Sequence, residues 1–412
     1  MADSETSPPS QGYQFGSFKG VFTPSILTIL GVVMYLRFGW VLGHLGLGKT
    51  LLVVTLSSAI TFLTGLSLSA LATNRRVGGG GAYFIISRSL GVEVGAGLGL
   101  PLYAAQTLGI SFYVTGFAES VTEIFPAYDI RVVGAITLVI VAVVAYLSAD
   151  LALKSQLVVM LLIFLSLGSL FVGDPESAKE LNPGPAVTEY KGFFAVFAVF
   201  FPAVTGIEAG IAMSGDLKDP DKALPRGTLA AVVTGYVVYM VIPIFISFSL
   251  GTSDEARQLL INHKMLLRDM AKWGKLVIAG LWAASLSSAM GAILGAPRTL
   301  QALAQDGVVP RFLGKGFGKG NDPRLATVLS FLIALAGVIL GKFDVIAGLL
   351  SMFFLTSYGL LNVCAGLEEF AAPPSWRPKF RVPWVLSLLG AGGCLTAMLL
   401  IDAGRTIIAV AV

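Results

Sequence analysis

The chain has 412 residues, of which 55% are hydrophobic and 13% are charged, and its formal net charge is +4. A soluble domain needs roughly a quarter of its residues charged, so these values and the mean hydropathy of +0.82 argue against a soluble globular protein. The small net charge argues against a nucleic-acid surface. The two cysteines, Cys364 and Cys394, lie inside apolar runs, which argues against a disulfide framework or a structural zinc site.

Long apolar stretches recur along the whole chain, close to or above the length that a helix needs to cross a bilayer. Eleven of them are present, near residues 20–43, 51–73, 92–122, 131–148, 152–173, 191–213, 227–250, 274–303, 325–341, 344–366 and 382–402. A further apolar run follows Arg405, and we expect its helix to be incomplete in this sequence. Residues 1–14 are polar and are expected to form a disordered cytosolic tail.

The distribution of charge between the stretches predicts the orientation of the chain. With the N-terminus inside, the inner loops carry the basic residues Arg75, Arg76, Lys218, Lys222, Arg226, Arg311, Lys315, Lys319, Arg324, Arg377, Lys379 and Arg381. Acidic residues dominate the outer loops near 119–129 and 174–189, while the loop at 251–275 is mixed. The sequence therefore predicts a multi-pass protein of the cell (inner or plasma) membrane with a cytoplasmic N-terminus.

Two of the stretches contain residues that interrupt a helix. Gly31 lies in the middle of the first, and Pro202, Gly206 and Glu208 lie in the middle of the sixth. Glycine permits unusual backbone dihedrals and proline removes a backbone donor. Interrupted helices at matching positions of two halves are typical of transporters with inverted repeats and a site at the membrane midplane. The alternative interpretation is a pair of plain kinked helices.

Polar side chains near these interruptions could form the site. Thr28 and Thr205 offer hydroxyl oxygens, and Tyr113 offers a phenol that can accept from or donate to a ligand. In the stretch 274–303, the adjacent Ser287 and Ser288 suit either close helix packing or a sodium ion, which prefers several oxygen ligands. The sequence leaves both interpretations of this serine pair open.

Charged residues inside membrane spans are costly and usually functional. Arg37 lies six residues beyond Gly31, and Glu119 lies six residues beyond Tyr113. If their two stretches flank one site, Arg37 and Glu119 could pair above it as an outer gate. Lys19 and Asp216 could form a corresponding inner gate, although a solvated surface position explains each of them equally well.

Motifs along residues 15–400 resemble those of the cation–chloride cotransporters, within the amino acid–polyamine–organocation superfamily. The matching segments, in chain order, are 15–21, 29–37, 79–83, 86–91, 113–119, 200–207, 214–220, 286–289, 301–303 and Tyr358. The small size of the chain suggests a prokaryotic member of that family.

The resemblance implies an all-α polytopic membrane protein with a 5+5 inverted-repeat (LeuT-like) core. Its first and sixth helices would be discontinuous. The ten-helix core would span residues 15–371, with repeat one at about 15–174 and repeat two at about 190–371. Residues 372–412 would add a peripheral eleventh helix and the start of a twelfth.

The resemblance also implies three kinds of ion site. One chloride would bind the backbone amides of Gly31, Val32 and Val33. A second chloride would bind Gly206, Ile207, Glu208 and Tyr358. Potassium would bind Thr28, Ile29, Tyr113, Pro202 and Thr205. Sodium would bind backbone oxygens of Leu27 and Leu30 together with Ala284, Ser287 and Ser288. The chain departs from the family at Thr28, where many relatives have asparagine, at Leu30, where they have tryptophan, and at Glu208, which replaces an uncharged residue.

The expected function is secondary active symport that couples sodium and/or potassium to chloride by alternating access, with sodium dependence favoured by the serine pair. A sodium- or proton-coupled amino acid permease of the same fold and a channel are the alternatives. The expected partners are small inorganic ions, the lipid bilayer and a second copy of the chain in a homodimer, with no nucleic acid. No chemical reaction and no cofactor are expected, apart from the transported sodium, potassium and chloride.

Overall fold

The computed structural model describes residues 15–74, 81–147, 149–174, 180–212, 217–318, 321–404 and 406, and the regular elements within these ranges are helices. In the first half of the chain the helices are η1 (Phe18–Phe22), α1 (Thr23–Ile29), α2 (Val32–Asn74), α3 (Ala82–Leu90), α4 (Val92–Ile124), α5 (Ile130–Leu147) and α6 (Ala149–Phe171). In the second half they are α8 (Phe193–Phe200), η2 (Phe201–Val204), α9 (Glu208–Ala212), α10 (Pro220–Leu250), α11 (Asp254–Asn262), α12 (Leu266–Met270), α13 (Gly274–Gln305), η4 (Arg311–Gly314), α14 (Arg324–Leu340), α15 (Phe343–Ala371) and α16 (Trp384–Ile401).

The apolar stretches correspond to these helices, with differences at their ends and in the loops between them. The first two stretches are joined, because α2 continues through Gly46 with a sharp kink at φ 71° and ψ 168°. α10 begins at Pro220, seven residues before the predicted stretch, since proline is well tolerated in the first turn of a helix. The polar loop at 251–275 contains the short helices α11 and α12, which the apolar pattern did not reveal.

Within the described residues, eight helical stretches are long and apolar enough to cross a membrane, and one of them, Phe18–Asn74, covers the first two predicted segments. α14 is a shorter apolar helix of 17 residues. α4 is 33 residues long and carries several polar side chains along its length. The structure is therefore that of an all-helical membrane protein.

The helices differ in how deeply they lie in the bundle. In the stretch from α8 to α9, Phe193–Ile211, 78% of the residues are buried, whereas only 28% of the residues are buried in α5 and in α16. α5 presents a row of exposed apolar side chains that suits contact with lipid, formed by Val132, Ile136, Val139, Ile140 and Val143. The interrupted sixth stretch is thus at the centre of the molecule and α5 at its periphery.

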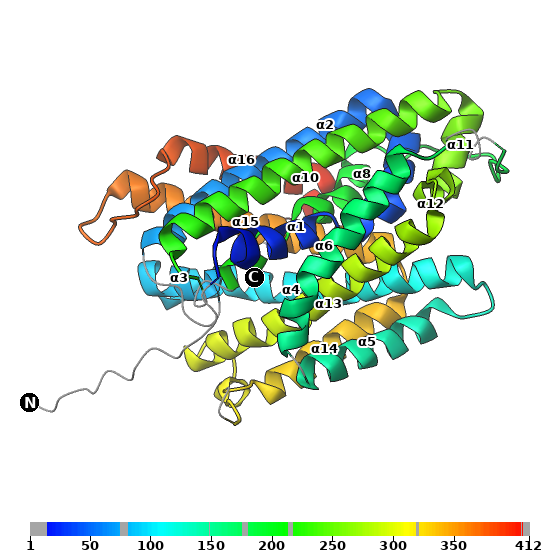
Figure 1. The fold of residues 1–412 in the computed structure, drawn as a ribbon. Coiled ribbons are helices and arrows are strands. Elements are labelled where there is room, and N and C mark those ends of the chain that lie inside the picture. The colour runs from blue at the N-terminus through cyan, green and yellow to red at the C-terminus, as the bar shows by residue number, and fades with distance from the viewer. Residues whose placement is uncertain are drawn as a thin grey trace, which may run out of the picture.

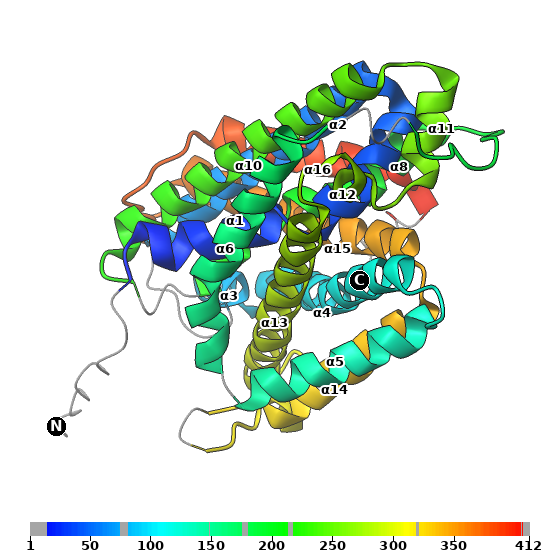
Figure 2. The same cartoon turned by 45° about the vertical axis from the view of Figure 1, so that its right-hand side comes forward.

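Long helices pack around this centre in two groups. α2 and α10 run side by side along one face, and α16 lies against α15 and α2 (Figure 1). α5 and α14 form the opposite face and pack on α4, which also contacts α13 (Figure 2). α1 lies between the groups and contacts α10, α9, η2 and α13, so the two interruptions meet in the middle of the bundle.

Candidate functional site

The first interruption separates α1 from α2. α1 ends at Ile29, Leu30 leaves helical geometry with φ −77° and ψ 52°, and α2 starts at Val32. Gly31 fills the gap, where an added Cβ would lie 2.9 Å from the carbonyl oxygen of Thr28. The last carbonyls of a helix have no partner within it, so this end of α1 exposes backbone oxygens while the start of α2 exposes backbone amides.

The second interruption separates η2 from α9. Thr205 is extended, with φ −88° and ψ 174°, and Gly206 has φ 100°, a conformation that favours glycine. An added Cβ at Gly206 would lie 2.7 Å from the side chain of Thr28. Both interruptions are therefore present, and they lie in direct contact with each other.

Two hydroxyl groups connect the interruptions. The Thr28 hydroxyl lies 3.2 Å from the carbonyl oxygen of Gly206 and 2.8 Å from that of Ser25. Tyr239 on α10 is fully buried, and its hydroxyl donates to the carbonyl oxygen of Ile29 and lies 3.2 Å from that of Ala203. The sequence analysis missed Tyr239, because a single tyrosine in the apolar stretch 227–250 gives no sign of which helix it faces.

The residues assigned to potassium lie at and beside the interruptions. The Thr205 hydroxyl donates to the carbonyl oxygen of Pro202 at 2.9 Å. Tyr113 on α4 is buried. Thr28 and Ile29 form the end of α1.

The residues assigned to the second chloride form one hydrogen-bonded group. The Tyr358 hydroxyl on α15 accepts from the backbone N–H of Gly206 at 3.3 Å and donates to Oε2 of Glu208 at 3.4 Å. Oε1 of Glu208 is buried and has no hydrogen-bond partner. Ile207, between Gly206 and Glu208, is fully buried. For the other chloride site, Gly31, Val32 and Val33 lie together at the start of α2.

The residues assigned to sodium lie on two helices that touch, α1 and α13. Leu27 and Leu30 are at the end of α1, and Ala284 is fully buried on α13. Ser288 is also buried, and its hydroxyl has no hydrogen-bond partner, whereas Ser287 is half-buried. Within the described ranges no cluster of three or more His, Cys, Asp or Glu side chains could hold a metal, so any cation here would rest on hydroxyl and carbonyl oxygens.

Above the interruptions, Arg37 and Glu119 form the predicted pair. Arg37 Nη2 lies 3.0 Å from Glu119 Oε2, and both side chains are buried. Arg37 Nε also lies 2.9 Å from Asp344 Oδ1. Lys264 lies 3.0 Å from Glu119 Oε1 and 2.9 Å from Glu123 Oε1. We call these five residues the outer charge network, because the sequence predicts that they lie on the external side.

The network extends beyond the pair that the sequence predicted. Asp344 stands at the start of α15, where it marked the edge of an apolar stretch, and Lys264 belongs to the mixed loop between α11 and α12. Burial lowers the pKa of Lys264, but the charge of Glu119 and the hydrogen bonds to Glu123 and Glu119 outweigh this and raise the pKa above its ordinary value. Lys264 is therefore a cation that holds the two carboxylates of α4.

The inner pair of the sequence analysis can be placed only in part. Lys19 is exposed on η1, and Asp216 lies outside the described residues. The backbone N–H of Lys218 donates to the carbonyl oxygen of Phe15 at 3.0 Å, and an added Cβ at Gly20 would meet Leu217. The segment before α1 thus packs against the start of the segment that leads into α10.

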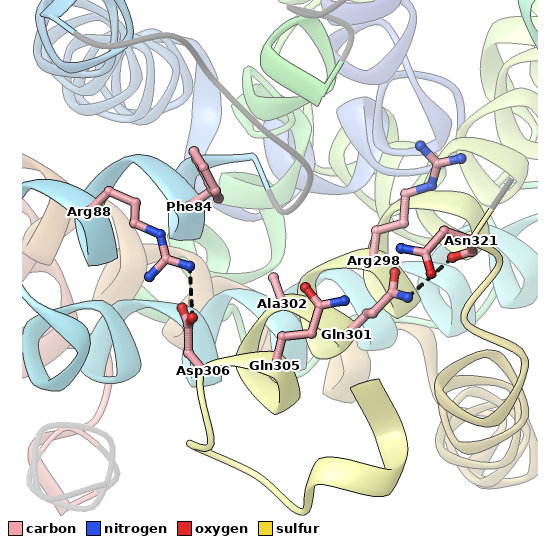
Figure 3. Close-up of a pocket in the computed structure, with 8 residues that line it drawn as sticks. All are labelled: Phe84, Arg88, Arg298, Gln301, Ala302, Gln305, Asp306 and Asn321. Carbon is pink, nitrogen blue, oxygen red and sulfur yellow. Dashed lines mark hydrogen bonds and ion pairs between the residues drawn. The ribbon is translucent and has the colours of Figure 1, made fainter. Parts of the chain in front are cut away.

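A second polar contact on this side joins α3 to the end of α13. Asp306 accepts from the Tyr83 hydroxyl at 2.8 Å and from Arg88 Nη2 at 2.8 Å. Figure 3 shows Arg88 reaching from α3 to Asp306 across a pocket that is also lined by Arg298, Gln301 and Asn321. None of the predicted ion ligands lines this pocket.

Comparisons with known proteins show the family and the fold of the chain. A family described as amino acid permease matches residues 20–412. Human solute carrier family 12 member 1 is 34% identical over 98% of this chain and 42% of its own length. Mouse solute carrier family 12 member 2 is 35% identical over 94% of this chain and 37% of its own. A Manduca sexta protein named bumetanide-sensitive sodium-(potassium)-chloride cotransporter is 33% identical over 97% of this chain and 43% of its own.

These relatives confirm the resemblance found in the sequence, although the chain spans only about two fifths of their length. Among solved structures, MhsT in complex with L-phenylalanine matches with a TM-score of 0.60 at 18% identity, over 94% of this chain and 99% of that one. At that identity the match shows the fold alone.

Proposed function

Because the chain belongs to the amino acid permease family, a family of transporters and not of enzymes, we propose that it is a secondary active symporter that couples sodium and/or potassium to chloride by alternating access. The name of the Manduca sexta relative, a sodium-(potassium)-chloride cotransporter, supports sodium, potassium and chloride as the transported ions. The contact between the two interruptions, where Thr28 meets Gly206, is the observation that carries the proposal. Irregular backbone at membrane depth is tolerated only where it is buried in protein or lines a water-filled cavity, and transporters form their ion sites at such discontinuous helices.

In the proposed mechanism, the backbone of the interruptions replaces part of the water around the ions. Carbonyl oxygens at the end of α1 and the hydroxyls of Thr28 and Thr205 would coordinate a potassium ion together with Tyr113, Ile29 and Pro202. Amides at Gly31, Val32 and Val33 would hold chloride. Charges of opposite sign bound close together stabilise one another in a low-dielectric site, so cation and chloride would bind cooperatively.

Sodium would bind between α1 and α13. The unpartnered hydroxyl of Ser288 supports this assignment, because a buried hydroxyl without a hydrogen bond is costly unless a ligand satisfies it. Ser287, the backbone at Ala284 and the carbonyl oxygens of Leu27 and Leu30 would complete the site. A cation there would link α1 to α13.

Access would alternate about the ten-helix inverted-repeat core, residues 15–371, with α16 and the residues after it at the periphery. The outer charge network would close the external side over the site, with Arg37 and Glu119 as the gate. Lys19 and Asp216 would close the cytoplasmic side, where the N-terminus would lie. The network of closed ion pairs above the interruptions supports a state shut to the outside.

Uptake by purified protein in liposomes tests the proposal. We expect inward chloride-36 uptake to require external sodium, and the double variant Ser287→Ala/Ser288→Ala to lose that sodium dependence. Ser285→Ala is a matched control on the same helix, because the Ser285 hydroxyl already donates a hydrogen bond to the carbonyl oxygen of Leu281 at 2.7 Å. Cation uptake that does not depend on the chloride concentration would contradict the proposal.

A sodium- or proton-coupled amino acid permease is the second candidate. The observation that favours it is the carboxylate of Glu208 at the interruption, with its Oε1 unpartnered, because a substrate ammonium group could satisfy that oxygen. Uptake of a labelled amino acid without chloride flux would establish this alternative. Turnover far above about 10³ ions per second would indicate a channel, because domain motions take microseconds to milliseconds.

A further inference from the structure

The second anion position contains a carboxylate of the protein itself. Tyr358 donates to Glu208 Oε2 at 3.4 Å and accepts from the Gly206 N–H at 3.3 Å. Resting on the proposed chloride symport, we propose that the Glu208 carboxylate serves as a fixed anion in place of the second chloride, so that this carrier binds and moves a single chloride in each cycle.

Hydrogen bonding at this position supports an internal anion. A tyrosine hydroxyl has one hydrogen, and here that hydrogen points to Glu208 while the oxygen accepts from Gly206. Two of the donors that would hold a chloride, the Gly206 N–H and the Tyr358 hydroxyl, are thus engaged with each other and with the carboxylate. A chloride placed beside them would also meet the like charge of Glu208, which opposes its binding.

The remaining oxygen of Glu208 indicates what balances its charge. Oε1 is buried and has no hydrogen-bond partner, and throughout the described ranges no Lys, Arg or His forms an ion pair with Glu208. An isolated charge in a membrane span is costly unless it is paired. Tyr358 and Gly206 connect Glu208 to Thr28, so a transported cation at Thr28 and Thr205 would supply the missing positive charge.

A fixed anion changes the charge carried in each cycle. In a carrier that takes sodium and potassium together, two cations and two chlorides would move no net charge. If Glu208 replaces one chloride and stays in the protein, two cations and one chloride move with one net positive charge. The membrane potential would then drive uptake, which is not the case for a neutral symporter.

Two measurements test this inference, with Glu208→Gln as the neutral variant of nearly equal shape and Glu208→Asp as the variant that keeps the charge. The first is the Hill coefficient for chloride in rubidium-86 uptake, with rubidium standing in for potassium. We expect about 1 for the wild type and Glu208→Asp and a rise toward 2 for Glu208→Gln. An inside-negative potential set by an ionophore should speed wild-type uptake and have less effect on Glu208→Gln.

The second measurement does not depend on transport. The melting temperature of the detergent-solubilised protein is followed while gluconate is replaced by chloride in sodium and potassium buffer. The slope of melting temperature against log chloride concentration rises with the number of chloride ions bound. We expect the slope for Glu208→Gln to be about twice that of the wild type.

The outcomes separate this inference from the proposed function. Equal slopes in the wild type and Glu208→Gln would overturn the fixed-anion inference even if chloride-dependent transport is found. A wild-type Hill coefficient near 2, with uptake indifferent to the membrane potential, would overturn it as well. Absence of any chloride-dependent uptake by the wild type would instead reject the proposed symport. If Glu208→Gln does not fold, the wild-type Hill coefficient and potential dependence still decide.

Discussion

The hydroxyl of Thr28 lies 3.2 Å from the carbonyl oxygen of Gly206, although the two residues are 178 positions apart in the chain. This contact fixes the end of α1 against the extended backbone between η2 and α9. Each partner has a second role in the same place, since Thr28 also bonds to Ser25 and Gly206 donates to Tyr358. The proposed cation and anion positions are therefore built from shared residues, and a change at one should affect the other.

Thr28→Val tests the role of this hydroxyl. Valine keeps the shape of threonine and removes its oxygen, so the fold should be retained while one cation ligand is lost. A net hydrogen bond is worth about 0.5–1.5 kcal/mol, and we expect the KM for rubidium-86 uptake to rise about two- to tenfold. Thr137→Val is a control, because the Thr137 hydroxyl bonds to the Val133 carbonyl oxygen at 2.8 Å within the peripheral helix α5. An unchanged KM in Thr28→Val would remove Thr28 from the cation site.

Glu119→Gln tests the outer charge network. Glu119 contacts both Arg37 and Lys264, and its side chain is 6% exposed. Removing one partner of a buried ion pair costs about 3–5 kcal/mol. We therefore expect a clearly lower melting temperature and a large loss of uptake. Glu123→Gln is the matched control, because Glu123 binds the same lysine with a side chain 37% exposed, where such pairs contribute about 0–1 kcal/mol.

The raised pKa of Lys264 predicts how the stability given by the outer charge network changes at alkaline pH. Its pKa in the folded protein is raised above the ordinary value of 10.5, mainly by Glu119 against the opposing effect of burial. A raised lysine pKa gives stability that is fully present below the unfolded pKa and is lost as pH rises through the folded pKa. The difference in melting temperature between the wild type and Lys264→Met should therefore be constant from neutral pH to about pH 10 and shrink above it. A difference that shrinks already near neutral pH would contradict this assignment.

Asp306→Asn tests the polar contact between α3 and α13. Asp306 accepts one hydrogen bond from the buried Tyr83 and one from Arg88, both at 2.8 Å. Hydrogen bonds to a charged group are worth about 1.5–3 kcal/mol, so amide hydrogen exchange in α3 should be about tenfold faster or more. Lys379→Gln, whose side chain is 70% exposed in its pair with Asp221, is a control that should leave α3 unchanged. Unaltered exchange in α3 would show that other contacts hold this helix.

The sequence predicted the interruptions because glycine and proline stand in otherwise continuous apolar runs, at Gly31 and at Pro202 and Gly206. It also predicted the pairing of Arg37 with Glu119, because charges are rare in such runs. It could not predict Tyr239, which connects both interruptions from α10, since apolar periodicity does not say which neighbour a buried tyrosine meets. Asp344 and Lys264 were missed for a related reason, because Asp344 stands at the edge of a span and Lys264 in a loop, where charged residues are ordinary.

Gly206→Ala tests the second interruption itself. Gly206 has φ 100°, which strains any residue with a Cβ, and that Cβ would lie 2.7 Å from the Thr28 side chain. The backbone strain alone costs about 1–3 kcal/mol, and relief requires that η2 and α9 move away from α1. We expect ion uptake to be lost while the protein still assembles in detergent.

Gly97→Ala on α4 is the matched control for Gly206→Ala, because nothing lies within 4 Å of its added Cβ and alanine favours a helix by about 0.5–1 kcal/mol over glycine. Size-exclusion profiles and rubidium-86 uptake of both variants separate a local effect from misfolding. Full uptake in Gly206→Ala would show that the contact between Gly206 and Thr28 is not part of the transport site.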